Sequence, residues 1–270
     1  MSNPDISLQL YTVNAALEPD LDGGLARLAD IGFTTVEAFD FVRRAPLLKE
    51  AFDRHGLTAA TGHSFLIQKE IPLPDGTTMT APTRDETFAA ANELGMSIVI
   101  DPFVAPAEWT TKDSVQRLAH ALNDAAVDAA KHGLSVGYHN HDHELRPIID
   151  GKPALAVFAD LLDPAIKLEL DLYWATAAHI DLVEFIQSLG DRIIAVHVKD
   201  GPMDREITTG KVPTDQVSAG AGDVKLAEAL AAAEHLKYAV IEFDGYQGDI
   251  FEGVAGSYDF LAAQLGKVAV

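Results

Sequence analysis

Cysteine is absent from the sequence, which excludes disulfides and metal sites built on thiolates. Long apolar runs are also absent, so we expect no membrane-spanning helix. Basic residues are few, because 20 Lys and Arg stand against 41 Asp and Glu and give a formal net charge of −21. Such an acidic surface repels phosphate backbones and anionic lipid, which argues against nucleic-acid and membrane partners. Residues 1–5 lack a basic or apolar start, so we predict no signal peptide and a cytoplasmic location.

Short apolar segments alternate with helical patterns along the 270 residues. Gly often follows the last residue of a helical pattern, as expected of a helix end. The patterns predict strands at residues 6–11, 34–38, 57–61, 97–100, 134–139, 166–170, 192–198 and 238–243. They predict helices at residues 21–31, 45–55, 84–94, 112–132, 153–162, 180–189, 224–235 and 250–265, and long loops at 64–82 and 202–222.

This alternation predicts a parallel sheet with helical crossovers. Eight such units in one chain of this length favour a (β/α)₈ TIM barrel, a single α/β domain over residues 1–270. The alternative is an open doubly wound sheet, but no G-x-G-x-x-G follows the first strand.

Ionisable residues follow several of the predicted strands, at the end where a TIM barrel carries its active site. The opposite strand ends carry mostly small and apolar residues. This asymmetry is the main evidence from the residues for an enzyme. The polar strand ends hold Glu37, His63, His139, Asn140, His141, Asp171, His197, Lys199, Glu242 and Asp244.

His, Asp and Glu at neighbouring strand ends form a nitrogen and oxygen site that suits Mn²⁺, Zn²⁺, Co²⁺, Mg²⁺ or Fe²⁺. Each residue also has a structural explanation when taken alone. His197 could be a hydrogen-bonded core histidine, Asp171 the cap of a following turn, and Trp174 part of the core. Glu169 shares a strand face with Asp171, and the sequence names no partner for this carboxylate.

Over nearly its whole length the chain resembles the sugar phosphate isomerase/epimerase superfamily, which has a xylose isomerase-like TIM barrel. The motifs that carry the resemblance are SLQLYT at residues 7–12, YHNHDHE at 138–144, ELDLYW at 169–174, HVKD at 197–200 and IEFD at 241–244. They are specific for the superfamily when they occur in this order, and they do not specify a substrate.

The resemblance implies one divalent metal ion, held by residues from strands five to eight, with Mn²⁺ as the first choice and Zn²⁺, Co²⁺ or Mg²⁺ as alternatives. Three ligands carry over directly, to Asp171, His197 and Glu242. Many relatives have Glu-Asn-His on strand five where this chain has His139-Asn140-His141, so His139 takes the fourth position, with Glu144 as the alternative.

The resemblance also implies a reaction. Ketose epimerases of this fold use two glutamates, one on each face of the sugar, to remove and return a proton beside a carbonyl. Here Glu242 is one candidate base, and His139 or His141 replaces the missing glutamate. We assign catalytic roles to these three residues and to Lys199. We assign substrate contacts to His63, Trp174, Glu37 and Glu144.

The predicted function is a metal-dependent isomerase or epimerase of a carbohydrate, a sugar or keto-sugar. A lyase that carries out a β-elimination on a keto-sugar, keto-inositol or 3-keto-glycoside would start with the same proton removal, so this reaction remains an alternative. For the oligomeric state, the sequence allows a homodimer or a homotetramer. An abasic-site endonuclease of the same fold needs further histidines, and Trp174 stands where one would be expected. A phosphosugar substrate would use the glycines of residues 220–222, which otherwise form an ordinary turn. A non-catalytic sugar-binding protein is the alternative from another class.

Overall fold

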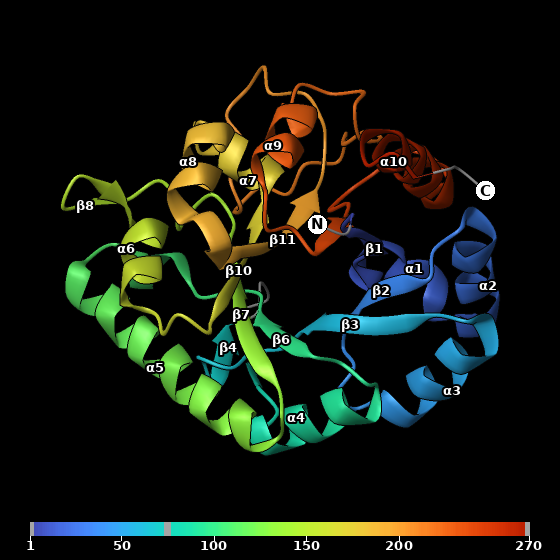
Figure 1. The fold of residues 1–270 in the computed structure, drawn as a ribbon, viewed down its shortest axis with the longest axis horizontal. Helices are drawn as coiled ribbons and strands as arrows, with labels where there is room; N and C mark the ends of the chain where they lie inside the picture. The colour runs from blue at the N-terminus through green and yellow to red at the C-terminus, as the bar shows by residue number, and fades with distance from the viewer. Residues whose placement is uncertain (1–2, 73–76, 268–270) are drawn as a thin grey trace.

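A computed structural model describes residues 3–72 and 77–267. Eight strands form one parallel sheet, in the order β1-β12-β11-β10-β7-β6-β3-β2. The sheet curls into a nearly closed barrel (Figure 1). The strands are β1 (Asp5–Leu8), β2 (Thr35–Ala38), β3 (Thr58–His63), β6 (Ile98–Asp101), β7 (Ser135–His139), β10 (Lys167–Asp171), β11 (Ile193–Val198) and β12 (Tyr238–Ile241). The predicted single-domain TIM barrel is therefore confirmed.

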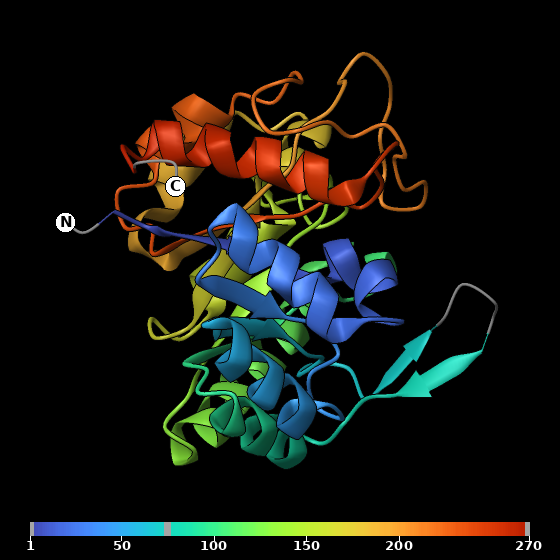
Figure 2. The ribbon, with the colours of Figure 1, turned by 90° about the vertical axis from the view of Figure 1, so that its right-hand side faces the viewer.

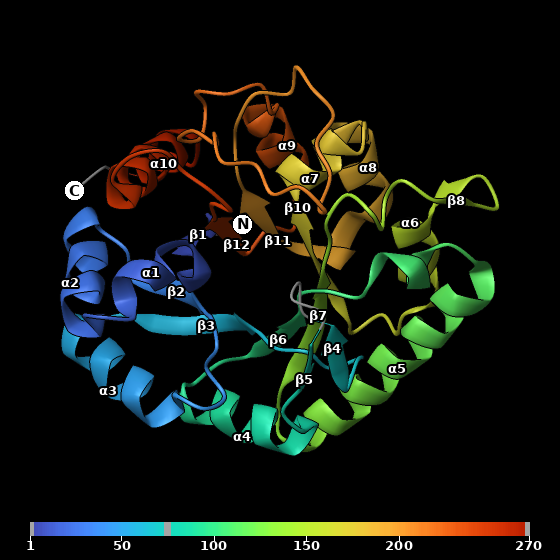
Figure 3. The same cartoon turned by 180° about the vertical axis from the view of Figure 1, so that it is seen from behind.

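Helices surround the barrel, as the view from behind also shows (Figure 3). They are α1 (Asn14–Leu17), α2 (Leu21–Ile31), α3 (Ala45–His55), α4 (Arg84–Glu93), α5 (Lys112–Lys131), α6 (Ala154–Leu161), α7 (Leu172–Ala177), α8 (Leu182–Leu189), α9 (Leu226–Ala232) and α10 (Ile250–Gln264). Single turns of 3₁₀ helix cover Leu10–Val13, Pro106–Trp109 and Gly190–Arg192. No helix among the described residues is long and apolar enough to cross a membrane.

Local signals set the ends of α2 and α3 where the sequence predicts them, whereas α8 starts two residues later than predicted and α9 is shorter than the predicted 224–235. Gly32 ends α2 with φ 115° and Gly56 ends α3 with φ 67°, conformations that disfavour other residues. Thr83 and Glu86 form a capping box at the start of α4. The main core lies between the sheet and these helices. Ile98 and Ile100 form a separate cluster with Ile194, and they face the barrel interior because Val99 between them packs in the main core.

The sheet closes at one weak seam. β1 and β2 are the two ends of the strand order, and a single parallel bridge joins them, from Gln9 to Glu37. The predicted first strand, residues 6–11, stops early at this seam. The side chain of Gln9 accepts a hydrogen bond from the backbone of Tyr11, and the chain turns into a 3₁₀ helix. Tyr11 consequently leaves the sheet and is 46% exposed.

Three further features differ from the prediction. The first predicted long loop contains an antiparallel pair, β4 (Glu70–Pro72) and β5 (Thr78–Thr80), which stands out from one end of the barrel (Figure 2). Helix α7 was not predicted because it starts at the residue after β10, with no turn between them. A second short pair, β8 (Ile148–Ile149) and β9 (Lys152–Pro153), precedes α6.

Candidate active site

Four side chains meet at the carboxyl ends of adjacent strands. His139 ends β7, Asp171 ends β10, His197 lies in β11, and Glu242 follows β12. Each offers a ligand atom, and these atoms all lie within 4.8 Å of one another. All four residues are buried, with at most 6% of their surface exposed. These are the four residues for which the sequence predicts metal ligation, and the parallel barrel brings them together.

Asp171 has two separate roles because its two oxygens point in different directions. Oδ1 accepts a hydrogen bond of 2.8 Å from the backbone of Trp174 and so caps helix α7. Oδ2 is buried, has no hydrogen bond, and lies 3.1 Å from Nζ of Lys199. Burial raises the pKa of this carboxyl to about 6, although the nearby Lys199 and His197 oppose the shift. The predicted capping role of Asp171 is therefore confirmed, and it leaves Oδ2 free of hydrogen bonds on the side of the site.

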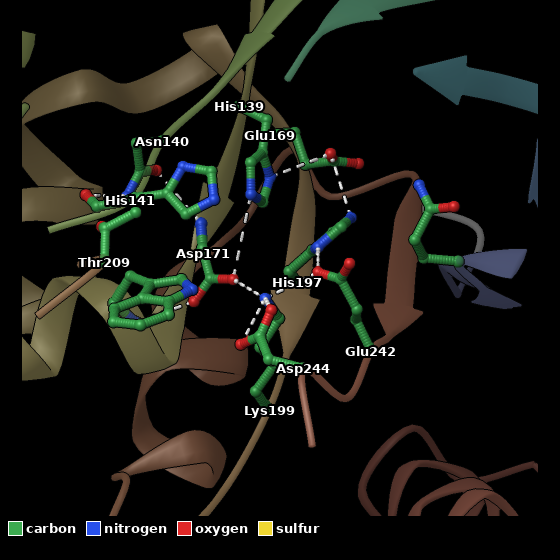
Figure 4. Close-up of polar contacts among 12 residues, drawn as sticks. His139, Asn140, His141, Glu169, Asp171, His197, Lys199, Thr209, Glu242 and Asp244 are labelled. Atoms are coloured by element: carbon green, nitrogen blue, oxygen red, sulfur yellow. Dashed lines mark hydrogen bonds and ion pairs between the residues drawn. The ribbon is translucent and has the colours of Figure 1, made fainter. Parts of the chain in front are cut away.

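Lys199 lies between the carboxylates of the site (Figure 4). Only 2% of the surface of this residue is exposed. Its ammonium nitrogen lies 2.7 Å from Glu242, 3.0 Å from Asp244 and 3.1 Å from Asp171. Burial alone would lower the pKa of Lys199, but these three acids raise it well above its usual range. For Glu242, burial alone would raise the pKa, but the positive charges of Lys199 and His197 outweigh burial and hold this pKa well below its usual value. Both groups are therefore charged at neutral pH.

A second layer of acids lies beneath the first. His197 Nδ1 is 2.6 Å from Glu242, whereas its Nε2 is 2.8 Å from Glu37 and 3.0 Å from Glu169. His63 Nε2 contacts the same two acids, at 3.1 Å from Glu37 and 2.8 Å from Glu169. Burial opposes a charge on both rings, but these carboxylates raise the pKa of His63 to about 10 and that of His197 well above normal.

Three supporting residues were not assigned a role from the sequence. Glu169, whose partner the sequence could not name, contacts three histidines, including His139 Nδ1 at 3.2 Å. Gln9 donates a hydrogen bond of 2.8 Å to Glu37. The carboxylate of Asp244 forms an ion pair with Lys199, and in the sequence only its position two residues after Glu242 points to it. The pairing of these residues depends on which strands are neighbours, which no single motif contains.

His139 and His141 are the neutral histidines of the site. Burial lowers the pKa of His139 well below its usual value, and the positive His197 adds to the effect. Burial also lowers the pKa of His141, followed by the charge of Lys199. Nδ1 of His141 is buried without a hydrogen bond. A neutral imidazole with a free nitrogen can accept a proton or ligate a metal ion.

Glu144, the alternative strand-five ligand, points elsewhere. Its oxygens accept hydrogen bonds from the hydroxyl of Tyr138, at 2.9 Å, and the backbone of His141, at 2.8 Å. Its possible metal partners are His141 and His143, not Asp171. Burial raises the pKa of Glu144 to about 8. The side chain therefore braces the loop that carries His141.

A cavity of about 650 Å³ opens above the site. Of the residues expected to contact substrate or move protons, it is lined by His63, His139, His141, Trp174 and Glu242. The other predicted residues lie behind this lining, where Lys199, Glu37 and Glu144 are at most 2% exposed. For these three, roles through neighbouring side chains fit the geometry better than direct substrate contact.

The glycines of residues 220–222 do not offer free amides to a phosphate. The carboxylate of Asp200 accepts hydrogen bonds from the backbone of Gly220 and Gly222, at 2.8 and 3.0 Å. It also accepts from Gly201 and Val224, at 2.9 and 3.1 Å. An acidic side chain thus occupies the position in which this loop would hold an anion.

The residues present fit a divalent cation. Five carboxylates, from Glu37, Glu169, Asp171, Glu242 and Asp244, are linked through ion pairs to three basic groups, from His63, His197 and Lys199. The buried site thus carries two more acids than bases, which is costly unless a further cation is bound. Oδ2 of Asp171, which has no hydrogen bond, and the neutral ring of His139 are ligands of the kinds that such a cation takes.

Comparison with known proteins agrees with this architecture. The family model described as xylose isomerase-like TIM barrel matches residues 25–262. A sugar phosphate isomerase/epimerase from Parabacteroides distasonis superposes with a TM-score of 0.77, 22% identity and coverage of 99% of this chain and 96% of that one. An L-ribulose 3-epimerase superposes with a TM-score of 0.65 and 18% identity, covering 98% of this chain and 95% of that one. The probable 3-DHS dehydratase AsbF from Bacillus anthracis superposes with a TM-score of 0.72 and 14% identity, covering 96% of this chain and 98% of that one. At these identities the likeness shows the fold alone. The search of curated proteins gave no match.

Proposed function

The chain belongs to the xylose isomerase-like TIM barrel family, and we propose that it is a divalent-metal-dependent sugar isomerase or epimerase. The proposed reaction starts with removal of a proton next to a carbonyl of a sugar or keto-sugar. The observation that carries the proposal is the buried set of His139, Asp171, His197 and Glu242 at the carboxyl ends of four adjacent strands. A cavity of about 650 Å³ lies directly above it.

These four residues would hold the ion, with Mn²⁺ as the first choice among the metals that accept nitrogen and oxygen ligands. A bound divalent ion would polarise the substrate carbonyl and stabilise the negative charge that develops on its oxygen. Beneath it, Glu37 and Glu169 accept from the second nitrogen of His197 and so fix the orientation of that ring.

His141 is the group that we assign to accept the proton. It lines the cavity, its Nδ1 has no hydrogen bond, and its lowered pKa keeps it neutral at physiological pH. Glu242 also lines the cavity and remains ionised beside Lys199, so it offers a second base. Phe103 contacts the edge of the His141 ring, with 5.7 Å between the centroids, and limits its movement.

Elimination by a lyase is the second candidate, and the histidine at position 139 favours it. Epimerisation needs a matched base on each face of the substrate carbon, and this chain has a histidine at a position where the resemblance implies a glutamate in many relatives. Elimination needs one base and a route for a leaving group, so a single neutral histidine suffices. Proton NMR of the product separates the two reactions.

The test combines metal content with solvent exchange. We expect one divalent ion per chain and deuterium incorporation from D₂O into a C–H of a keto-sugar. Asp171→Asn keeps an oxygen to cap α7 but loses the charge toward the metal, so it should fold and lose both properties. Asp160→Asn, at an exposed acid of α6, is the matched control. Failure to exchange a proton with any of a panel of keto-sugars, with metal bound, would contradict the proposal.

A further inference from the structure

The cavity above the site has two chemically different parts. Its polar floor includes His139, Glu242 and Asp244. Its walls come from loops after several strands and are largely aromatic or apolar. These wall residues are Phe39, Phe65, Met79, Phe103 and Trp174. A ligand that fills the cavity must therefore present polar groups at one end and apolar surface at the other.

Exposed apolar side chains gather at the mouth of this cavity. Seven large hydrophobic residues are exposed among the residues that the structure describes, and three of them line the cavity. These are Tyr11, Met79 and Val212, with exposures of 46%, 37% and 54%. They come from the turn after β1, the pair β4–β5 and the second long loop, so sequence proximity does not explain their meeting. Covering these side chains would be favourable, and the floor of the same cavity is the site where the substrate reacts.

The cavity is larger than an unsubstituted monosaccharide requires. Its 650 Å³ equals the volume of about 20 molecules of liquid water, at roughly 30 Å³ each. A hexose has roughly a dozen non-hydrogen atoms, so it leaves much of a pocket of this drug-sized class unfilled. The unfilled space lies against the aromatic walls when the hydroxyl groups of the sugar meet the polar floor.

A phosphate group has no free cationic partner here, because the charged His63 of the lining is already paired with Glu37 and Glu169. Arg43 is the one Lys or Arg lining the cavity within the described ranges, and its side chain is 75% exposed and paired with Asp40. Three carboxylates line the same cavity, from Asp40, Glu242 and Asp244, and would repel a phosphate. The amides of Gly220 and Gly222 are already engaged by Asp200.

We infer that the substrate is an unphosphorylated sugar or sugar-like polyol that carries an apolar substituent of aromatic size. This inference rests on the proposed function, because it places the reacting carbonyl at the floor. The substituent lies between the phenylalanine walls and the mouth residues Met79 and Val212. The inference concerns recognition alone, so it can fail while metal binding and proton exchange stand.

The test compares methyl and phenyl glycosides of the same sugars by isothermal titration calorimetry, with Mn²⁺ present. Glucose, xylose and galactose provide three such pairs, and glucose 6-phosphate represents the phosphosugars. Burying a phenyl ring should tighten binding about tenfold or more over the methyl glycoside. We expect glucose 6-phosphate to bind no better than glucose.

Two double variants make the test specific. Met79→Ser/Val212→Ser removes apolar surface at the mouth and should reduce the ratio of phenyl-glycoside to methyl-glycoside affinity several-fold. Leu47→Ser/Val127→Ser removes exposed apolar residues elsewhere and should leave the ratio unchanged.

Three results would overturn the inference. The first is equal binding of the paired glycosides, or no binding of any phenyl glycoside. The second is tighter binding of glucose 6-phosphate than of glucose. The third is a changed oligomeric state in the Met79/Val212 variant with an unchanged ratio, which would assign the apolar mouth to an interface between copies of this chain. Metal content and deuterium exchange are measured in parallel, so failure of the proposed function is recognised separately.

Discussion

Replacing Lys199 with Met should make the stability of the protein depend on a bound metal. Met has a similar length but no charge, so Asp171, Glu242 and Asp244 would face one another without their shared cation. At an effective dielectric constant of ~20, a charge pair at these distances of about 3 Å attracts by roughly 5–6 kcal/mol before the cost of desolvation. After that cost, removal of one partner from a buried ion pair typically destabilises a protein by ~3–5 kcal/mol. This is a large part of the roughly 5–15 kcal/mol that stabilises a typical domain.

Urea unfolding followed by circular dichroism, in EDTA and in Mn²⁺, measures this effect. In EDTA, Lys199→Met should lose ~3 kcal/mol or more of unfolding free energy relative to the wild type. Mn²⁺ should return most of it, because a bound ion replaces the missing positive charge and stabilises only the folded state. Lys152→Met, at a lysine whose side chain is 59% exposed, is the matched control and should change little in either condition.

The reasoning would be wrong if Lys199→Met lost no more in EDTA than the ~1 kcal/mol of a surface ion pair. It would also be wrong if Mn²⁺ stabilised the variant no more than the wild type. The first result would mean that the carboxylates repel one another weakly, and the second that the cation site lies elsewhere.

Three further predictions follow from buried acids outside the lining of the cavity. Burial raises the pKa of Glu144 from its ordinary value of 4.5 to about 8 in the folded protein. The stabilising contribution of the neutral carboxyl is therefore complete below about pH 4.5 and is lost as the pH rises through about 8. Glu144→Gln should therefore gain stability relative to the wild type across that range, in urea unfolding at a series of pH values. Glu169→Gln should weaken metal affinity about 10–100-fold, by titration calorimetry, because the carboxylate orients three histidines. Asp200→Asn should cost ~1–3 kcal/mol of unfolding free energy, and the Gly220 and Gly222 amides should exchange faster by NMR, because an amide cannot accept four hydrogen bonds as a carboxylate does.

The sequence predicts the barrel well because each unit carries its own local signals. Periodic apolar positions and the glycines at 32 and 56 place α2 and α3 at the residues where the structure has them. It fails where one residue serves two elements. Asp171 ends β10 and caps α7 without an intervening turn, so the sequence pattern shows no boundary there.

The set of site residues is predictable for a similar reason, whereas their pairing is not. In a parallel barrel all strand ends of one kind face the same side, so residues that end the strands must converge. Which carboxylate a lysine or histidine contacts depends on strand register and side-chain direction. The register shift between Leu168 and Glu169 is one such feature, and the position of Lys199 among three acids is another.

The seam between β1 and β2 links the closure of the barrel to the protonation of the histidines in the site. The single bridge that closes the sheet runs from Gln9 to Glu37, and the same glutamate receives His197 and His63. A change in the charge of either histidine therefore alters the strength of the Gln9–Glu37 contact that closes the barrel. Local opening of the barrel at this seam is therefore linked to binding in the site. The seam should open least often when a ligand occupies the site.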